Sequence, residues 1–97
     1  MSDGAAAHAV VVVVVLPPAL LPLFPGAPAE VTVAACCVRT ALEALDARWP
    51  GMRDRLCDSC PAIRRHINVF VNGDRATLAT KLPPGAEMVV TTAISGG

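Results

Sequence analysis

The chain has 97 residues, of which 54% are hydrophobic, and its eight basic and eight acidic residues give a formal net charge of zero. A chain of this length forms one small domain around a single core, so two domains are excluded. The zero net charge excludes the basic surface that nucleic-acid binding requires. Disorder of the whole chain is also excluded, because disordered chains combine low hydrophobicity with high net charge.

Residues 4–29 carry no Asp, Glu, Lys or Arg, a feature shared with membrane spans and secretory signals. Five prolines in this stretch argue against a membrane-spanning helix, which needs about 20 continuous apolar residues. A signal peptide begins with a positively charged region, whereas the first basic residue here is Arg39. We therefore expect a cytoplasmic protein that does not enter membranes. Its cysteines are then expected to be reduced; they are Cys36, Cys37, Cys57 and Cys60.

The N-terminal third predicts a loose end, a strand and a loop. Residues 1–7 have no pattern and are expected to be disordered. Residues 9–16 form a bounded apolar run with six consecutive valines, which predicts a strand buried on both faces and therefore central in its sheet. Pro17 and Pro18 end this strand. The leucines and Phe24 that follow are interrupted by prolines and predict an irregular loop folded over the core.

The middle of the chain predicts a second strand and then a helix. Residues 30–33 alternate polar and apolar side chains and predict a short strand. From residue 38 the apolar side chains recur with helical spacing, which predicts an amphipathic helix of about three turns, ended by Pro50-Gly51. Its start is not marked, because Cys36 and Cys37 stand where Ser, Thr or Asp would cap best. The apolar face of the helix consists of Val38, Ala41, Leu42, Leu45 and Trp49.

The C-terminal part predicts two further strands. After a short helical turn at 52–56 and a loop at 57–61, residues 67–71 alternate as a third strand, and Asn72-Gly73 is a strong turn signal. Residues 76–82 are short and mixed, Pro83-Pro84-Gly85 predicts a second turn, and residues 88–94 alternate as the last strand. One helix laid across one mixed sheet buries the apolar faces of both.

Four segments together resemble the MoaD/ThiS family of ubiquitin-like sulfur carriers, and most of all its CysO type. They are the valine strand at 10–15, Trp-Pro-Gly-Met-Arg at 49–53, Arg-His-Ile-Asn-Val-Phe-Val-Asn-Gly at 65–73, and the terminal Gly96-Gly97. The resemblance covers residues 10–97. It implies an α+β, ubiquitin-like β-grasp fold with one main helix on a mixed sheet of four to five strands, as a single domain over residues 1–97. It also implies a flexible Gly-Gly tail at 95–97.

The resemblance implies a carrier that is a co-substrate of other enzymes and not itself an enzyme. Gly97 would be adenylated and converted to a thiocarboxylate, most directly for cysteine biosynthesis, with Ser95 and Gly96 as the part of the tail that threads into the partner. Because glycine has no Cβ, such a tail passes a narrow channel and leaves the carbonyl carbon unhindered. The implied partners are a ubiquitin-activating-type adenylating enzyme, a rhodanese or cysteine desulfurase as sulfur donor, and a cysteine-synthase-like acceptor. ATP would bind to the adenylating enzyme, so the carrier itself needs no cofactor.

Three other functions stay open at the level of sequence. The first is the small subunit of a molybdopterin synthase, and the second is a ubiquitin-like modifier that forms isopeptide bonds with lysines. The third is a zinc or thiol module, because Cys57 and Cys60 have the C-x-x-C spacing of half a zinc site. Cys36 and Cys37 do not supply the other half, since consecutive side chains diverge in an extended segment. The pathway is also open among cysteine, thiamine, molybdopterin and secondary metabolites.

The remaining polar residues do not form a catalytic constellation. Asp54 and Asp58 stand next to arginines and are expected on a solvated surface, and His8 and His66 are expected to be ordinary strand-end residues. Phe70 lies on the opposite strand face from the buried positions of its strand. Beside Val89 or Thr91 it would help to dock a partner; the alternative is that the loop around Leu23 and Phe24 covers it.

Overall fold

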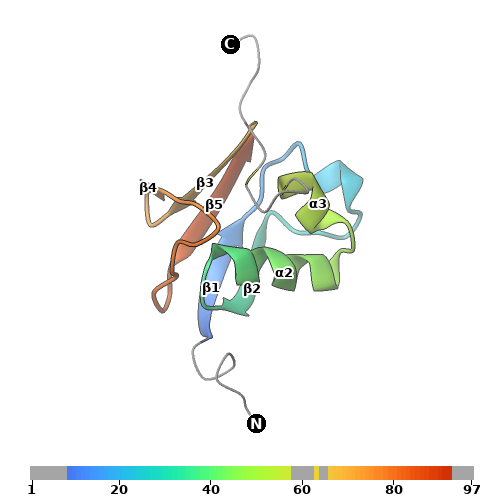
Figure 1. The fold of residues 1–97 in the computed structure, drawn as a ribbon. Coiled ribbons are helices and arrows are strands. Elements are labelled where there is room, and N and C mark those ends of the chain that lie inside the picture. The colour runs from blue at the N-terminus through green and yellow to red at the C-terminus, as the bar shows by residue number, and fades with distance from the viewer. Residues whose placement is uncertain (1–8, 58–62, 64–65, 93–97) are drawn as a thin grey trace.

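A computed structural model describes residues 9–57, 63 and 66–92, and these form a mixed sheet with one main helix against one of its faces (Figure 1). This confirms the α+β class predicted from the sequence. Residues 1–7 and the terminal 95–97 lie outside the described residues. The elements are β1 (Val10–Val15), the 3-10 helix η1 (Leu21–Leu23), β2 (Glu30–Ala35), α2 (Val38–Arg48), α3 (Met52–Leu56), β3 (Ile67–Val71), β4 (Asp74–Arg75) and β5 (Glu87–Thr92).

The five strands of the described sheet lie in the order β2-β1-β5-β3-β4. The first long strand and the last lie side by side and run parallel, with Val13 opposite Glu87 and Val15 opposite Val89. The other neighbouring strands pair antiparallel. The short strand β4 is not predicted by the sequence, because two exposed residues give no alternating pattern.

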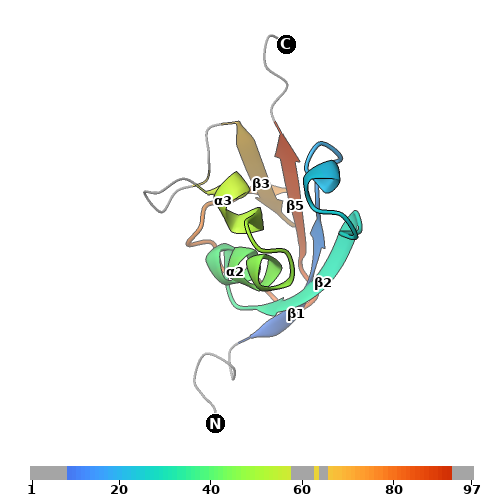
Figure 2. The ribbon, with the colours of Figure 1, turned by 90° about the vertical axis from the view of Figure 1, so that its right-hand side faces the viewer.

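Strand β1 is interior in the sheet, as predicted, but it is not buried on both faces. Val12 and Val14 are fully buried, whereas Val11 is 61% exposed, and Val13 and Val15 are half-buried. The physical reason is that the helices cover only one face of this sheet (Figure 2). A valine run satisfies the β-propensity of both faces, so it does not reveal that one of them meets solvent.

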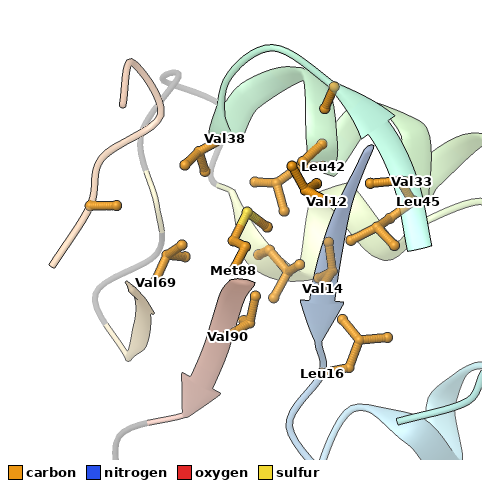
Figure 3. Packing of buried hydrophobic residues seen from close by; sticks show 14 of the residues in the cluster. Val12, Val14, Leu16, Val33, Val38, Leu42, Leu45, Val69, Met88 and Val90 are labelled. Atoms are coloured by element: carbon orange, nitrogen blue, oxygen red, sulfur yellow. The ribbon is translucent and has the colours of Figure 1, made fainter. Parts of the chain in front are cut away.

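Helix α2 presents its predicted apolar face to the sheet. Leu42 and Leu45 point into the core toward Val12 and Val14 of β1 and Met88 of β5 (Figure 3). The helix start, which the sequence does not mark, is fixed by Thr40, three residues inside the helix boundary at Cys37. The Thr40 hydroxyl oxygen accepts a hydrogen bond from the Cys37 backbone N–H at 3.0 Å and donates to the Cys37 carbonyl at 2.9 Å.

The Asn72-Gly73 turn is confirmed. Both residues have positive φ, +50° and +90°, as a tight turn between antiparallel strands requires. The Asn72 side chain also joins this turn to β5, because its amide oxygen accepts a hydrogen bond from the Glu87 backbone N–H at 3.0 Å. Strand β5 ends at Thr92 among the described residues, and the predicted strand residues Ala93 and Ile94 lie outside them.

Candidate functional site

The predicted sulfur-carrying residue Gly97 and the tail residues Gly96 and Ser95 lie outside the described residues. What the structure does place is the end of the sheet from which the chain continues toward them. The last described residue, Thr92, pairs with Ile67 at the start of β3. Because β1 and β5 are parallel, the loop that follows β1 lies at this same end of the sheet (Figure 2).

The second part of the candidate site is the sheet face that the helices leave open. The strand register places one residue from each of the five strands in a single row across this face. The row runs from an acidic residue at one sheet edge, through three half-buried apolar residues, to a basic residue at the other edge. In strand order its members are Glu30, Val15, Val89, Phe70 and Arg75.

Phe70 is the aromatic member of this row, and it is half-buried by its neighbours on adjacent strands. It pairs with Val89 of β5, one of the two neighbours predicted for it, and with Arg75 of β4. The Arg75 guanidinium carbon lies 5.9 Å from the centre of the Phe70 ring, within cation–π range. Phe24 belongs to the loop that was the alternative prediction for covering Phe70. In the structure Phe24 lies next to Gly51 at the start of α3.

Arg75 and Val15 are members of the row that the sequence analysis did not identify. A signal for Arg75 was present, because a two-residue Asn-Gly turn places residue 75 opposite residue 70. No such signal exists for Val15. Its place beside Val89 follows from parallel pairing between strands more than 70 residues apart in the chain, which neither strand's own pattern encodes.

A pair of thiols lies at the start of α2. The sulfur atoms of Cys36 and Cys37 lie 3.6 and 3.7 Å from the same Thr40 hydroxyl oxygen, so the expected divergence of these two side chains is wrong. Burial acts to raise the pKa of the Cys37 thiol. Hydrogen bonds from the Thr40 backbone and hydroxyl, from Cys36 and from the Arg39 backbone outweigh burial and lower this pKa below 9.0.

Of the two cysteines in the C-x-x-C motif, only Cys57 lies among the residues that the structure describes. Cys57 is buried at the end of α3, where its backbone N–H donates to the Arg53 carbonyl at 2.7 Å, and Cys60 lies outside the described residues. No group of three or more His, Cys, Asp or Glu side chains within 9–57, 63 and 66–92 is arranged to hold a metal ion. Within the same part of the chain, no helix has the length and apolar character of a membrane span.

The other polar residues considered from the sequence lie at the surface where the structure describes them. Asp54 is exposed on α3 between the exposed side chains of Arg53 and Arg55, as predicted. His66 is exposed directly before β3, which confirms its strand-end position. Asp58 and His8 lie outside the described residues.

Comparison with solved structures defines the class of protein. The chain superposes on the Amycolatopsis orientalis BexX/CysO complex with a TM-score of 0.78 and 24% identity, covering 89% of this chain and 99% of that one. It superposes on Mycobacterium tuberculosis CysO, described as an antigen, with a TM-score of 0.77 and 27% identity, covering 86% of this chain and 99% of that one. It superposes on SAMP1 from Haloferax volcanii with a TM-score of 0.74 and 28% identity, covering 90% of this chain and 99% of that one. No protein-family model and no curated protein sequence matches the chain.

The fold is therefore the ubiquitin-like β-grasp, at the full length of these neighbours. The resemblance predicted from the sequence is confirmed, because CysO and SAMP1 are ubiquitin-like β-grasp sulfur carriers or modifiers. These neighbours are small carrier proteins and not enzymes. One of them was solved in a complex with BexX.

Proposed function

We propose that this chain is a sulfur carrier whose C-terminal Gly97 is adenylated and converted to a thiocarboxylate. The observation that supports the proposal is the similarity to CysO over 86% of this chain and 99% of that one, together with the Gly96-Gly97 terminus. In the first step the Gly97 carboxylate attacks the α-phosphorus of ATP and pyrophosphate leaves. Hydrosulfide then attacks the carbonyl carbon, AMP leaves with the bonding electron pair, and sulfur remains on Gly97.

The chemistry belongs to partner enzymes in this proposal. The adenylating enzyme binds ATP, and a rhodanese or cysteine desulfurase supplies the sulfur in the cell as a persulfide. A thiol reductant then releases this sulfur as hydrosulfide and is itself oxidised to a disulfide. The acceptor is a cysteine-synthase-like enzyme, which places the carrier in cysteine biosynthesis. The open sheet face, which carries Phe70, is the surface that we propose for docking these partners, because a half-buried apolar row flanked by charges is suited to protein recognition.

The proposal is tested by loading the carrier in vitro. The intact chain, incubated with an adenylating enzyme, ATP and sulfide, is expected to exchange one oxygen for sulfur on its C-terminal peptide, as measured by mass spectrometry. Deletion of Gly97, or addition of one residue after it, is expected to abolish the exchange. Gly97→Ala is expected to be less severe, because it adds one methyl group beside the reacting carbon. Equal loading of the intact and Gly97-deleted chains would contradict the proposal.

A second function is supported by the SAMP1 neighbour from Haloferax volcanii, because SAMP1 stands for small archaeal modifier protein 1. As a modifier, the chain would form isopeptide bonds between Gly97 and lysine side chains of target proteins. The two functions share adenylation and differ in the group that attacks the acyl carbon. A ladder of covalent conjugates in cells, lost on deletion of Gly97, would favour the modifier over the dedicated sulfur carrier.

A further inference from the structure

Residues 17–29, which we call the apolar lobe, form a loop without a single polar or charged side chain. Loops between strands usually carry polar residues, because they meet water. Leu23 of this lobe is 50% exposed, which makes it one of the two most exposed large hydrophobic residues in the described part of the chain. The exposed positions of the lobe are Pro18, Ala19, Pro22, Leu23, Pro25, Gly26, Pro28 and Ala29.

The lobe is pre-ordered. Its base is closed by a hydrogen bond from the Leu16 backbone N–H to the Ala29 carbonyl at 2.8 Å, and successive turns are closed by bonds such as Leu23 N–H to the Leu20 carbonyl at 3.1 Å. Leu20 is buried in the core, so it anchors the lobe while Leu23 faces solvent. A surface that is already rigid loses little conformational entropy when a partner binds it.

The lobe lies at the end of the sheet from which the chain leads to its last residues. It follows directly on β1, and β1 is paired in parallel with β5, so that η1 and the end of β5 share one end of the sheet (Figures 1 and 2). Five residues follow Thr92 in the sequence, and an extended chain spans about 3.6 Å per residue. An enzyme that acts on residue 97 must therefore approach this end of the sheet to within roughly 18 Å.

We propose that the apolar lobe is a second contact surface for the enzyme that adenylates Gly97, and that this enzyme carries a matching apolar surface beside the entrance to its active site. The inference rests on the proposed function. The lobe differs from the open sheet face in its chemistry, because it offers no charge for recognition. Leu23 is its anchor, since an exposed leucine on a rigid loop gains the most from burial in an apolar pocket.

The test compares Leu23→Ser and Leu23→Asp with the matched control Ala79→Asp. Ala79 is also apolar and exposed, but it lies between Leu78 and Thr80, whose carbonyls accept hydrogen bonds from the start of α2, at the end of the sheet opposite the lobe. Carrier-dependent ATP–pyrophosphate exchange is measured with an adenylating enzyme that activates the unmodified chain, and the KM for the carrier and kcat are determined separately. We expect Leu23→Ser to raise this KM about fivefold and Leu23→Asp more than tenfold, with kcat unchanged, and Ala79→Asp to change neither.

The outcomes are distinguishable. If the unmodified chain is adenylated but the KM for both Leu23 variants stays within twofold of its value, the lobe is not a contact surface and the carrier function stands. If deletion of Gly97 leaves the exchange unchanged, the carrier function and the inference both fail. If the unmodified chain sediments as a dimer and the Leu23→Asp variant as a monomer, the lobe is a contact surface between two copies of this chain. That result would overturn the inference. Equal urea midpoints for all three variants show that any effect on KM is not caused by unfolding.

Discussion

The carboxylate of Asp46 on α2 accepts a hydrogen bond from the backbone N–H of Gly51, with 3.0 Å between Oδ1 and the nitrogen. The same oxygen accepts a second bond from the Arg53 backbone N–H at 3.1 Å. Gly51 has a φ of +97°, a value that side-chain-bearing residues rarely adopt. One side chain of the long helix therefore satisfies two backbone donors at the start of α3 and fixes the turn between the two helices.

Asp46→Ala is expected to lower the free energy of unfolding by about 1 to 3 kcal/mol, because both backbone donors lose their acceptor. Asp46→Asn is the matched control, since its amide oxygen still accepts and only the charge is lost. We expect the asparagine variant to retain at least half of the difference. Urea unfolding of the three proteins measures this, and an alanine variant as stable as the unmodified chain would show that water replaces the carboxylate at no cost.

Leu45→Ala is expected to destabilise the fold by about 2 to 5 kcal/mol, because Leu45 is fully buried against β1 and its truncation leaves a cavity. This is a large fraction of the total stability of a small domain. Glu43→Ala, on the exposed side of the same helix, serves as the control and is expected to change stability by less than about 0.5 kcal/mol. Equal denaturation midpoints for the two variants would contradict the packing described above.

Cys37 is expected to react with iodoacetamide at a lower pH than an ordinary thiol, because its hydrogen bonds favour the thiolate and lower its pKa below 9.0. Because the folded state favours the Cys37 thiolate, the same pKa shift stabilises the fold at high pH. This stabilisation is fully present above the ordinary thiol pKa of the unfolded state and is lost as the pH falls through the lower pKa of the folded state.

Variants of Thr40 test whether its hydroxyl contributes to the lowered pKa of Cys37. Thr40→Val is expected to move the pH midpoint of Cys37 alkylation upward, whereas Thr40→Ser keeps the hydroxyl and is expected to move it less. Peptide mass spectrometry reports the labelled fraction of Cys37 as a function of pH. A midpoint that does not respond to Thr40→Val would mean that the backbone donors alone set the pKa.

Phe70→Ser is expected to raise the KM of the adenylating enzyme for the carrier about fivefold or more, because truncation of an aromatic anchor costs about 1 kcal/mol or more of binding free energy. The kcat is expected to be unchanged, since the residue is distant in sequence from Gly97 and takes no part in the chemistry. Glu43→Ala on the helix side serves as the control. Equal KM values for the Phe70 and Glu43 variants would show that the partner does not use the open face.

The four cysteines are expected to be dispensable for carrying sulfur, because the proposed transferable sulfur sits on the Gly97 carbonyl carbon. A variant with serine at positions 36, 37 and 60, and with serine or alanine at the buried position 57, is expected to form thiocarboxylate like the unmodified chain. Loss of loading by a variant with a cooperative unfolding transition would instead favour a persulfide on a cysteine.

Much of the local structure was predictable from the sequence. The apolar spacing from Val38 to Leu45 gave the helix and its buried face, and Asn72-Gly73 gave the turn that places Arg75 opposite Phe70. These features depend on residues only a few positions apart, where periodicity and turn chemistry act directly. The alternation in β3 likewise placed Phe70 on the face opposite Ile67 and Val69.

The tertiary structure alone decided how distant segments meet. Parallel pairing of Val13 with Glu87 joins residues from opposite ends of the chain, and no pattern within either strand specifies that register. The same pairing decides that Val15 completes the open row and that the apolar lobe lies beside the end of β5. The packing of the helices on one face of the sheet decides that one side of β1 faces solvent. Local propensities determine which elements form, whereas the neighbours of each strand are set by the packing of the whole core around α2.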